Sequence, residues 1–173
     1  MCDACLRPAR ACLCRWVVPV RHTTEVLILQ HPMEVHHAKN SARLLHMCLG
    51  SSRMLVGETF ETTALHAALQ GPATNVLLYP QCEQSAAVLP AWRPDTLAST
   101  TSVRLVVLDA TWRKSRKMLH QNPLLRGLPR LSLDGTQASR YLIRKSHKPG
   151  QLSPLEATCA ALAQLEDDGA RYT

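Results

Sequence analysis

Two groups of residues in this chain combine residue types and spacings that could do chemistry. The first is the tetrapeptide from Asp109 to Trp112, which separates an apolar run (103–108) from a basic run (113–117). A carboxylate in this position could bind a cation or accept a proton. The second is a cluster of four thiols that could hold a metal ion, formed by Cys2, Cys5, Cys12 and Cys14.

The sequence around Asp109 favours a functional role for this carboxylate. The apolar run predicts a buried strand, and open α/β sheets bind ligands at the carboxyl ends of their strands. An Asp or Thr between a strand and a helix is often only an N-cap, and Trp112 could belong to the core. Arg113 and Lys114, however, fall in the first helical turn, where the helix dipole disfavours cations by about 0.3–1 kcal/mol each. We therefore expect this helix to face an external anion.

The cysteine cluster predicts a structural zinc site. Two, six and one residues separate the four cysteines, so one tetrahedral Zn²⁺ could bind all of them. A redox pair or chance clustering is the alternative explanation. Four protein ligands leave no open coordination position, so the zinc would support folding and RNA contact rather than catalysis. We expect residues 1–20 to form a small zinc knuckle.

Composition limits the fold and the partners. The chain has 173 residues, of which 46% are hydrophobic and only 4% aromatic, which predicts one domain with an aliphatic core. The net charge of +7 favours a polyanionic partner such as RNA or an acidic membrane. No apolar run approaches the roughly 20 residues that span a bilayer, so we expect no membrane partner. Cysteines without a secretory signal indicate a reducing compartment, and we expect a cytoplasmic location.

Hydrophobic periodicity predicts alternating strands and helices. The expected strands cover 25–30, 54–56, 75–79, 103–109 and 130–133. The expected helices cover 34–49, 62–69, 81–89, 112–120 and 154–166. This order favours an α/β fold with a mostly parallel sheet and helices on both faces.

Cations gather in three of these segments, and we expect them to contact RNA. On the predicted helix 34–49 they are Lys39 and Arg43. The helix after the tetrapeptide carries Arg113, Lys114, Arg116 and Lys117. The long connection 134–151 carries Arg140, Arg144 and Lys145. A basic helix face is often only solvated, but here the same sign of charge recurs in all three segments.

Five motifs occur in an order that resembles the DTW domain family of tRNA-uridine aminocarboxypropyltransferases. They are the four-cysteine cluster, His31 to Glu34 with Asn40 to Arg43, Leu78 to Pro80, Asp109 to Trp112, and Tyr141 to Arg144 with Leu152 to Ala157. The resemblance implies a SPOUT-like catalytic domain over residues 21–173, with a C-terminal trefoil knot. Knots are rare, so composition and spacing alone would not predict one.

The resemblance also implies S-adenosylmethionine as the co-substrate, held among three loops that follow strands. The residues implied for this contact are Tyr79, Pro80, Leu108, Thr111, Trp112, Leu133, Ile143, Ser153 and Glu156. Ser153 and Glu156 also match a capping box, which by itself explains both residues. The chain has no glycine-rich nucleotide-binding motif, so glycine spacing does not predict a nucleotide.

The implied reaction transfers the 3-amino-3-carboxypropyl group to N3 of a tRNA uridine and releases 5′-methylthioadenosine. Asp109 is the expected catalytic residue, because it could accept the N3 proton or bind the ammonium group of the methionine moiety. A methyltransferase of the same superfamily that acts on RNA, or a noncatalytic zinc-containing RNA-binding module, would share many of these features. We expect tRNA as the partner, no obligate protein partner, and a monomer or homodimer.

Overall fold

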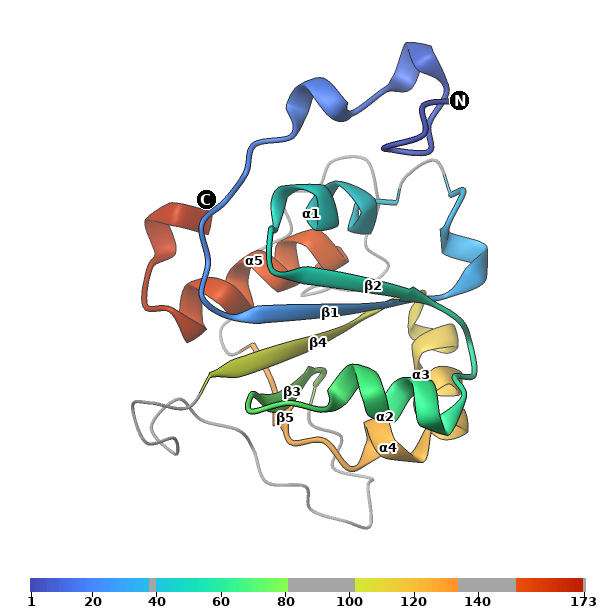
Figure 1. Ribbon diagram of the computed structural model, residues 1–173, viewed down its shortest axis with the longest axis vertical. Coiled ribbons are helices and arrows are strands. Elements are labelled where there is room, and N and C mark those ends of the chain that lie inside the picture. The colour runs from blue at the N-terminus through green and yellow to red at the C-terminus, as the bar shows by residue number, and fades with distance from the viewer. Residues whose placement is uncertain (38–39, 81–101, 134–151, 173) are drawn as a thin grey trace.

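The computed structural model describes residues 1–37, 40–80, 102–133 and 152–172. Its centre is a sheet of five strands in the order β2-β1-β4-β3-β5 (Figure 1). The strands are β1 Glu25–Gln30, β2 Ser52–Val56, β3 Thr74–Leu78, β4 Val103–Asp109 and β5 Arg130–Leu131. Each neighbouring pair runs parallel. The carboxyl ends of the strands therefore share one edge of the sheet.

Helices cover both faces of this sheet (Figure 1). The first face is covered by α1 Ala42–Cys48 and α5 Pro154–Leu165. The second face is covered by α2 Thr62–Leu69, α3 Trp112–Gln121 and α4 Pro123–Arg126. Single 3₁₀ turns cover Ala9–Ala11, Cys14–Trp16, Pro32–Glu34 and Gly169–Tyr172. Both faces of the central strands are thus removed from water.

The residues of β1 show how one strand serves two cores. Val26 and Ile28 pack on the side of α1 and α5, whereas Leu27 and Leu29 pack on the side of α2, α3 and α4. This follows from the alternation of side chains along a strand. A strand buried on both faces needs a continuous apolar run, which β1 supplies. The core is aliphatic, as the low aromatic content predicts.

The structure confirms the predicted α/β class, the parallel sheet and, within two residues, the bounds of the strands. The predicted helix 34–49 is wrong in its first half, because α1 begins only at Ala42. Asn40 explains the break, since its side-chain oxygen accepts the backbone N–H of Ala42 at 3.0 Å. The helix expected over 112–120 is followed directly by a second one, α4, which begins at Pro123, a residue favoured in the first helical turn.

Two predicted segments lie outside the described residues. They are the helix at 81–89 and the long connection 134–151, whose path would decide whether the chain is knotted. The knot therefore stays a prediction. In the described part of the chain, no helix combines the length and apolar character needed to cross a membrane.

Candidate functional site

Asp109 is buried at the end of β4 and held there by two amide side chains. The register of β1 and β4 places Asp109 beside Gln30, where both central strands end. Gln30 Nε2 donates to Asp109 Oδ2 at 2.7 Å, and Asn40 Nδ2 donates to the same oxygen at 2.6 Å. Asp109 is 3% exposed. One strand and a residue bonded to the first turn of α1 thus fix the position of the carboxylate.

The two amide donors favour the ionised form of Asp109. Hydrogen bonds donated to a carboxylate stabilise its negative charge, and bonds to a charged group are stronger than bonds between neutral groups. Burial opposes this effect, so the two donors offset part of the cost of a negative charge at the edge of the sheet where α/β folds bind ligands. Such a charge could bind an ammonium group or orient a substrate N–H.

The turn after β1 carries a second buried acid and a histidine, and it is hydrogen-bonded to the backbone of Asp109. The buried Glu34 pairs with Lys114 of α3, with 3.1 Å between Oε1 and Nζ. The backbone N–H of His31 donates to the carbonyl of Asp109 at 3.0 Å. His31 Nδ1 accepts the Met33 N–H at 3.2 Å, which assigns the ring proton to Nε2. Because that lone pair is occupied, His31 is a poor candidate for a general base.

The His31 ring also contacts Glu58, in the loop before α2. Nε2 of His31 lies 3.1 Å from Oε1 of Glu58. Lys117 Nζ lies 2.9 Å from the other oxygen of Glu58. The hydrogen bonds from Lys117 and then from His31 lower the pKa of Glu58 below its usual value. This pairing links the turn after β1 to the basic helix α3.

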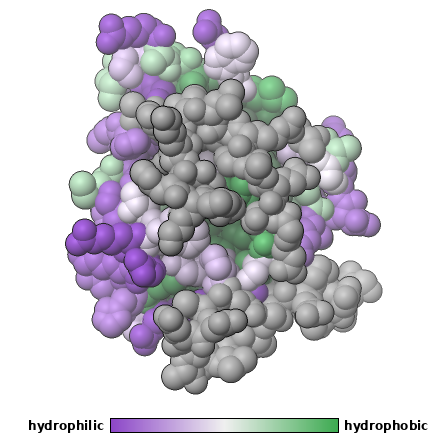
Figure 2. Space-filling model, turned by 180° about the vertical axis from the view of Figure 1, so that it is seen from behind, coloured by the Kyte–Doolittle hydropathy of each residue, from purple (hydrophilic) through white to green (hydrophobic). Residues whose placement is uncertain are grey.

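Helix α3 presents its predicted RNA-binding cations in two ways. Arg113 and Arg116 are exposed, whereas Lys114 and Lys117 form ion pairs with Glu34 and Glu58. Figure 2 views the molecule from behind, so the side of α3, at the right in Figure 1, is at the left there. Strongly hydrophilic side chains gather along that left side. The two arginines are therefore the residues of α3 best placed for a phosphate backbone.

Thr111 and Trp112 begin α3 and contribute differently to the site. Thr111 is the N-cap, and its hydroxyl accepts the Lys114 N–H at 3.4 Å. Trp112 is 43% exposed and meets the ring of Tyr79 edge-on, with 5.6 Å between centroids. The Tyr79 hydroxyl lies 3.3 Å from Ser115 Oγ of α3. The two rings form an aromatic surface beside the sheet edge, on which a nucleobase could stack.

The remaining residues predicted to contact S-adenosylmethionine have varied surroundings. Pro80 is exposed, Leu108 is buried in the core under α3, and Leu133 is partly buried against the α5 side. Ser153 and Glu156 form the expected capping box: the Ser153 N–H donates to the Glu156 carboxylate at 2.9 Å, and the Glu156 N–H donates to Ser153 Oγ at 3.2 Å. The predicted site residues outside the described part of the chain are Lys39, Arg140, Ile143, Arg144 and Lys145.

The four cysteines of the predicted knuckle converge and could hold a metal ion. Their sulfur atoms all lie within 4.8 Å of one another. The shortest separations are 3.6 Å between Cys2 and Cys14 and 3.7 Å between Cys5 and Cys12. A tetrahedron with Zn–S bonds of about 2.3 Å has edges of about 3.8 Å, so the observed separations fit zinc.

The acidities of these thiols also fit a cation. A backbone hydrogen bond from Leu13 lowers the pKa of Cys5 to about 6, whereas the hydrogen bond with Cys2 raises the pKa of Cys14 to about 12. Crowded thiols thus give up their protons unequally, because neighbouring thiolates repel each other. A divalent metal would remove that repulsion and stabilise all four as thiolates.

Two hydrogen bonds tie the knuckle to the site. Arg7 Nη2 donates to the carbonyl of Asn40 at 2.6 Å, and Arg43 Nε donates to the carbonyl of Ala4 at 2.9 Å. The sequence predicted an RNA contact for Arg43, and the structure places its guanidinium against the knuckle backbone. Asn40 therefore touches both the knuckle and Asp109.

The sequence interpretation did not select Gln30 and Asn40 as site residues. Gln30 is the polar residue that follows the apolar run 26–29 at the carboxyl end of β1, which is a signal for a functional position at a sheet edge. Asn40 carries no such signal by itself. Its role depends on the fold of the turn before α1, which brings residues 69 positions apart into contact.

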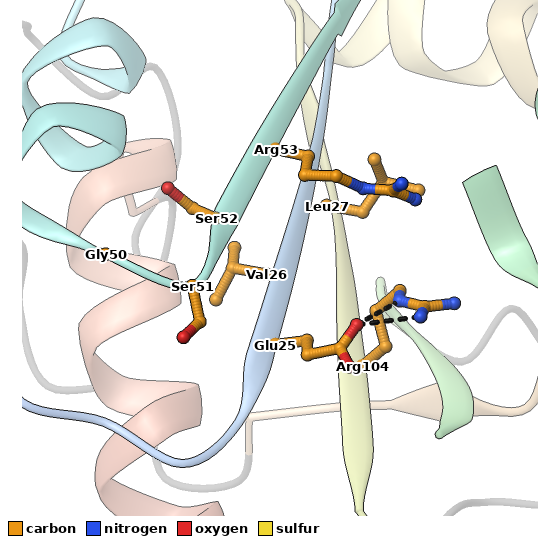
Figure 3. A pocket seen from close by; sticks show the side chains of 8 residues that line it. All are labelled: Glu25, Val26, Leu27, Gly50, Ser51, Ser52, Arg53 and Arg104. Atoms are coloured by element: carbon orange, nitrogen blue, oxygen red, sulfur yellow. Dashed lines mark hydrogen bonds and ion pairs between the residues drawn. The ribbon is translucent and has the colours of Figure 1, made fainter. Parts of the chain in front are cut away.

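A pocket of about 300 Å³ lies away from this site, at the amino ends of β1 and β2. It is lined by Glu25, Val26, Leu27, Gly50, Ser51, Ser52, Arg53 and Arg104 (Figure 3). Glu25 and Arg104 neutralise each other there at 2.7 Å. Because Asp109 lies at the opposite end of the strands, we assign this pocket no part in the chemistry.

Comparisons with known proteins agree with the resemblance in sequence. The family model for the DTW domain matches residues 1–173. The chain is 31% identical to tRNA-uridine aminocarboxypropyltransferase 2 of Drosophila melanogaster, over 95% of this chain and 66% of that protein. It is 30% identical to the Mus musculus protein of the same name, over 95% of this chain and 56% of that protein. It is also 30% identical to tRNA-uridine aminocarboxypropyltransferase A of Arabidopsis thaliana, over 98% of this chain and 74% of that protein.

The chain spans 56% to 66% of the length of these two animal relatives. No solved structure matches it significantly. Since the family model covers every residue, from the cysteine cluster through the tetrapeptide at Asp109 to the last helix, the chain belongs to the DTW domain family.

Proposed function

We propose that this protein transfers the 3-amino-3-carboxypropyl group of S-adenosylmethionine to N3 of a tRNA uridine. The products are 3-(3-amino-3-carboxypropyl)uridine and 5′-methylthioadenosine. The names of the relatives support a transferase that acts on tRNA uridine. The observation that carries the proposal is the buried carboxylate of Asp109, held between two amides at the carboxyl edge of the sheet, with the basic helix α3 directly after it.

The reaction is a substitution at carbon. The uridine N3 lone pair forms a bond to the terminal carbon of the 3-amino-3-carboxypropyl group. The bond from that carbon to sulfur breaks, and sulfur keeps the electron pair as a thioether. The N3 proton leaves to a base or to water. The donor is already activated as a sulfonium, so the protein must chiefly align the two reactants and handle this proton.

Of the two roles considered for Asp109, the geometry supports binding of the donor ammonium group. Gln30 and Asn40 stabilise the ionised carboxylate and so weaken it as a proton acceptor. An ionised, immobile carboxylate is well suited to hold an ammonium group and so to select which carbon of the sulfonium faces the uridine. Attack on the methyl carbon would instead make the protein a methyltransferase.

We further propose that Cys2, Cys5, Cys12 and Cys14 bind one structural Zn²⁺, which would crosslink the knuckle. Residues 1–20 would then form the zinc unit and residues 21–173 the catalytic unit, with the SPOUT-like fold and C-terminal knot that the resemblance to the family implies. A cytoplasmic location, and a monomer or homodimer without an obligate protein partner, remain predictions. The cytoplasmic location is supported by the reducing environment that free thiols need.

The test is product analysis by mass spectrometry after incubation of the protein with S-adenosylmethionine and tRNA that lacks the modification. The proposal predicts the modified uridine and 5′-methylthioadenosine in equal amounts. If a methylated base and S-adenosylhomocysteine were found instead, the reaction would be methyl transfer and the proposal would be wrong. Intact tRNA binding without either product would support the noncatalytic RNA-binding module instead.

A further inference from the structure

Among the residues that the structure describes, Arg130 is a buried cation without a carboxylate partner. It is 8% exposed, and its Nε is the one buried side-chain nitrogen or oxygen among the described residues without a hydrogen-bond partner. Nη1 donates to the carbonyl of Pro80 at 3.2 Å, and the guanidinium carbon lies 5.4 Å from the centre of the Tyr79 ring. No carboxylate of the described residues forms an ion pair with it. A buried charge without a counter-charge is costly, so its retention needs an explanation.

Arg104 shows how this same fold satisfies a buried arginine that has a structural role. It is 6% exposed, close to the value for Arg130. Its Nε and Nη2 both reach the Glu25 carboxylate at 2.7 Å (Figure 3). Its Nη1 donates to the Gln70 carbonyl and to Asn75 Oδ1. Arg130, by contrast, has one neutral carbonyl and an aromatic ring. Its remaining donors have no acceptor within the described ranges and could bind an anion.

The guanidinium of Arg130 reaches the edge of the sheet that carries Asp109. Arg130 begins β5 and pairs with Leu77 of β3, so its side chain lies on the face of Leu77, under α3 and α4. From there it extends to the carbonyl of Pro80, three residues further along. Leu77 pairs with Val106, and Asp109 lies three residues beyond Val106. The Arg130 guanidinium therefore crosses from β5 to the end of β3, and there it reaches the level of Asp109 on β4, the strand on the other side of β3.

The two charges approach this edge from opposite faces. Leu108 packs on the face of α3, and alternation along β4 places Asp109 on the other face, where Gln30 and Asn40 hold it. A ligand at the edge thus meets a fixed anion from one side and a cation from the other. An amino acid carries an ammonium and a carboxylate on one carbon, and it needs this arrangement of opposite charges.

We propose that Arg130 binds the carboxylate of the amino acid moiety of the donor. This inference rests on the proposed function, because it takes a sulfonium-linked amino acid as the substrate. The planar guanidinium has donors in the geometry that a carboxylate accepts. The Tyr79 ring beside it presents an electron-rich face that also attracts a cation such as a sulfonium. The small exposed area of Arg130 fits a carboxylate on a small molecule better than a phosphate of a polynucleotide.

The test compares ligands that differ only in this carboxylate. Isothermal titration with the full chain would use S-adenosylmethionine, its decarboxylated analogue, which keeps the sulfonium and the amine, and 5′-methylthioadenosine. We expect the wild-type protein to bind S-adenosylmethionine about 10- to 100-fold more tightly than the decarboxylated analogue. Equal affinity for these two ligands would overturn the inference without any need for a variant.

The variant Arg130→Gln removes the charge and supplies a second comparison. We expect it to bind S-adenosylmethionine about 10- to 100-fold more weakly and to bind the decarboxylated analogue and 5′-methylthioadenosine within about threefold of the wild type. Arg126→Gln, an exposed cation in α4, is the matched control and should change none of the three. An equal loss for all three ligands in Arg130→Gln would mean that Arg130 only supports the turn at Pro80, and would refute the proposal.

Two further outcomes separate this inference from the proposed function. If wild-type protein bound neither S-adenosylmethionine nor 5′-methylthioadenosine, the proposed function itself would fail, and this inference with it. If Arg130→Gln kept its affinity for S-adenosylmethionine but bound tRNA more weakly, with a smaller dependence of binding on salt, Arg130 would be an RNA phosphate contact. The proposed function would then stand, and the carboxylate assignment would be wrong.

Discussion

Asn40 and Asp109, 69 residues apart in the chain, are joined by a hydrogen bond of 2.6 Å from amide nitrogen to carboxylate oxygen. Asn40 also accepts the Ala42 N–H with its side-chain oxygen and the Arg7 guanidinium with its backbone carbonyl. One residue therefore contacts the cysteine knuckle, the start of α1 and the buried acid of the site. This arrangement leads to predictions for each of these parts.

Asp109→Asn is expected to lower turnover at least about 100-fold, because the amide keeps the shape but removes the negative charge. Affinity for tRNA should stay the same or rise slightly, since an anion near a polyanion is lost. Single-turnover rates and filter binding measure the two quantities. Asp167→Asn, at the far end of α5, is the charge-matched control. A variant that lost tRNA binding and turnover together would point to a structural role for Asp109.

Asn40→Ala is expected to lower turnover about 10-fold and stability by about 1–3 kcal/mol, because Asp109 loses a donor and the first turn of α1 loses an acceptor for its backbone N–H groups. Gln30→Ala removes the other donor without touching α1, so it should lower turnover with a smaller loss of stability. Urea unfolding and single-turnover rates at several pH values would separate these effects. Turnover unchanged in Gln30→Ala would show that the donors do not set the state of Asp109.

Metal analysis of the purified protein is expected to find one zinc per chain. Removal of zinc by a chelator, or the substitution Cys12→Ser, should lower the thermal midpoint and increase hydrogen exchange at the start of α1, because Arg7 and Arg43 tie the knuckle to that helix. Cys48→Ser, outside the cluster, is the control. Exchange at α1 that did not respond to zinc removal would mean that the two units are independent.

Glu166 is expected to make stability depend on pH. Burial alone would raise its pKa, but hydrogen bonds from the Tyr172 hydroxyl and from the backbone of Thr24 and Thr23 outweigh it and lower the pKa to about 2, from an ordinary value of 4.5. A lowered folded-state pKa contributes stability that is fully present above pH 4.5 and is lost as the pH falls towards 2.

The variant Glu166→Gln should therefore be less stable than the wild type by about 1–2 kcal/mol at neutral pH, and this difference should shrink as the pH falls from 4.5 to 2. Urea unfolding of both proteins at several pH values measures it. Glu61→Gln, exposed before α2, is the control. A difference that stayed constant with pH would assign the effect to packing rather than to the charge.

Arg113→Gln and Arg116→Gln should each weaken tRNA binding and reduce the slope of log affinity against log salt by about one. Lys117→Gln should have a smaller effect, because its ammonium is paired with Glu58. Binding measured from low to high salt provides the slopes. If Arg126→Gln, on the neighbouring helix α4, weakened binding as much, the contact would not be specific to α3.

The sequence was sufficient for those parts of the site that depend on local pattern. An apolar run followed by Asp109 and a basic periodicity predicted a strand, a sheet edge and α3, and the capping box at Ser153 was confirmed in detail. The helix expected over 34–49 was wrong because apolar residues kept a helical spacing across the turn that ends at Asn40. Hydrophobic periodicity predicts which face of a helix is apolar. It does not predict that a side chain such as that of Asn40 will accept a hydrogen bond from the backbone two residues ahead and so interrupt the helix.

Contacts between distant segments were beyond the reach of pattern. Gln30 meets Asp109 only because β1 lies beside β4 in the sheet, although β2 and β3 come between them in the chain. Arg130 looked like an ordinary cation at the start of a strand. Only the folded structure shows that no carboxylate of the described residues pairs with it. Strand order and side-chain satisfaction are properties of the folded chain, so single-sequence reasoning could not supply them.

The central place of β1 in the sheet also affects the protein during its synthesis. β1 can pair with β2 soon after it is made, but its other edge waits for β4, about 80 residues later in the chain. At a synthesis rate of about 5–20 residues per second, this edge stays open for roughly 4 to 16 s. An open strand edge with an apolar centre, such as residues 26–29, is a template for pairing with other chains. The nascent chain, rather than the finished protein, is therefore the form most in need of a chaperone.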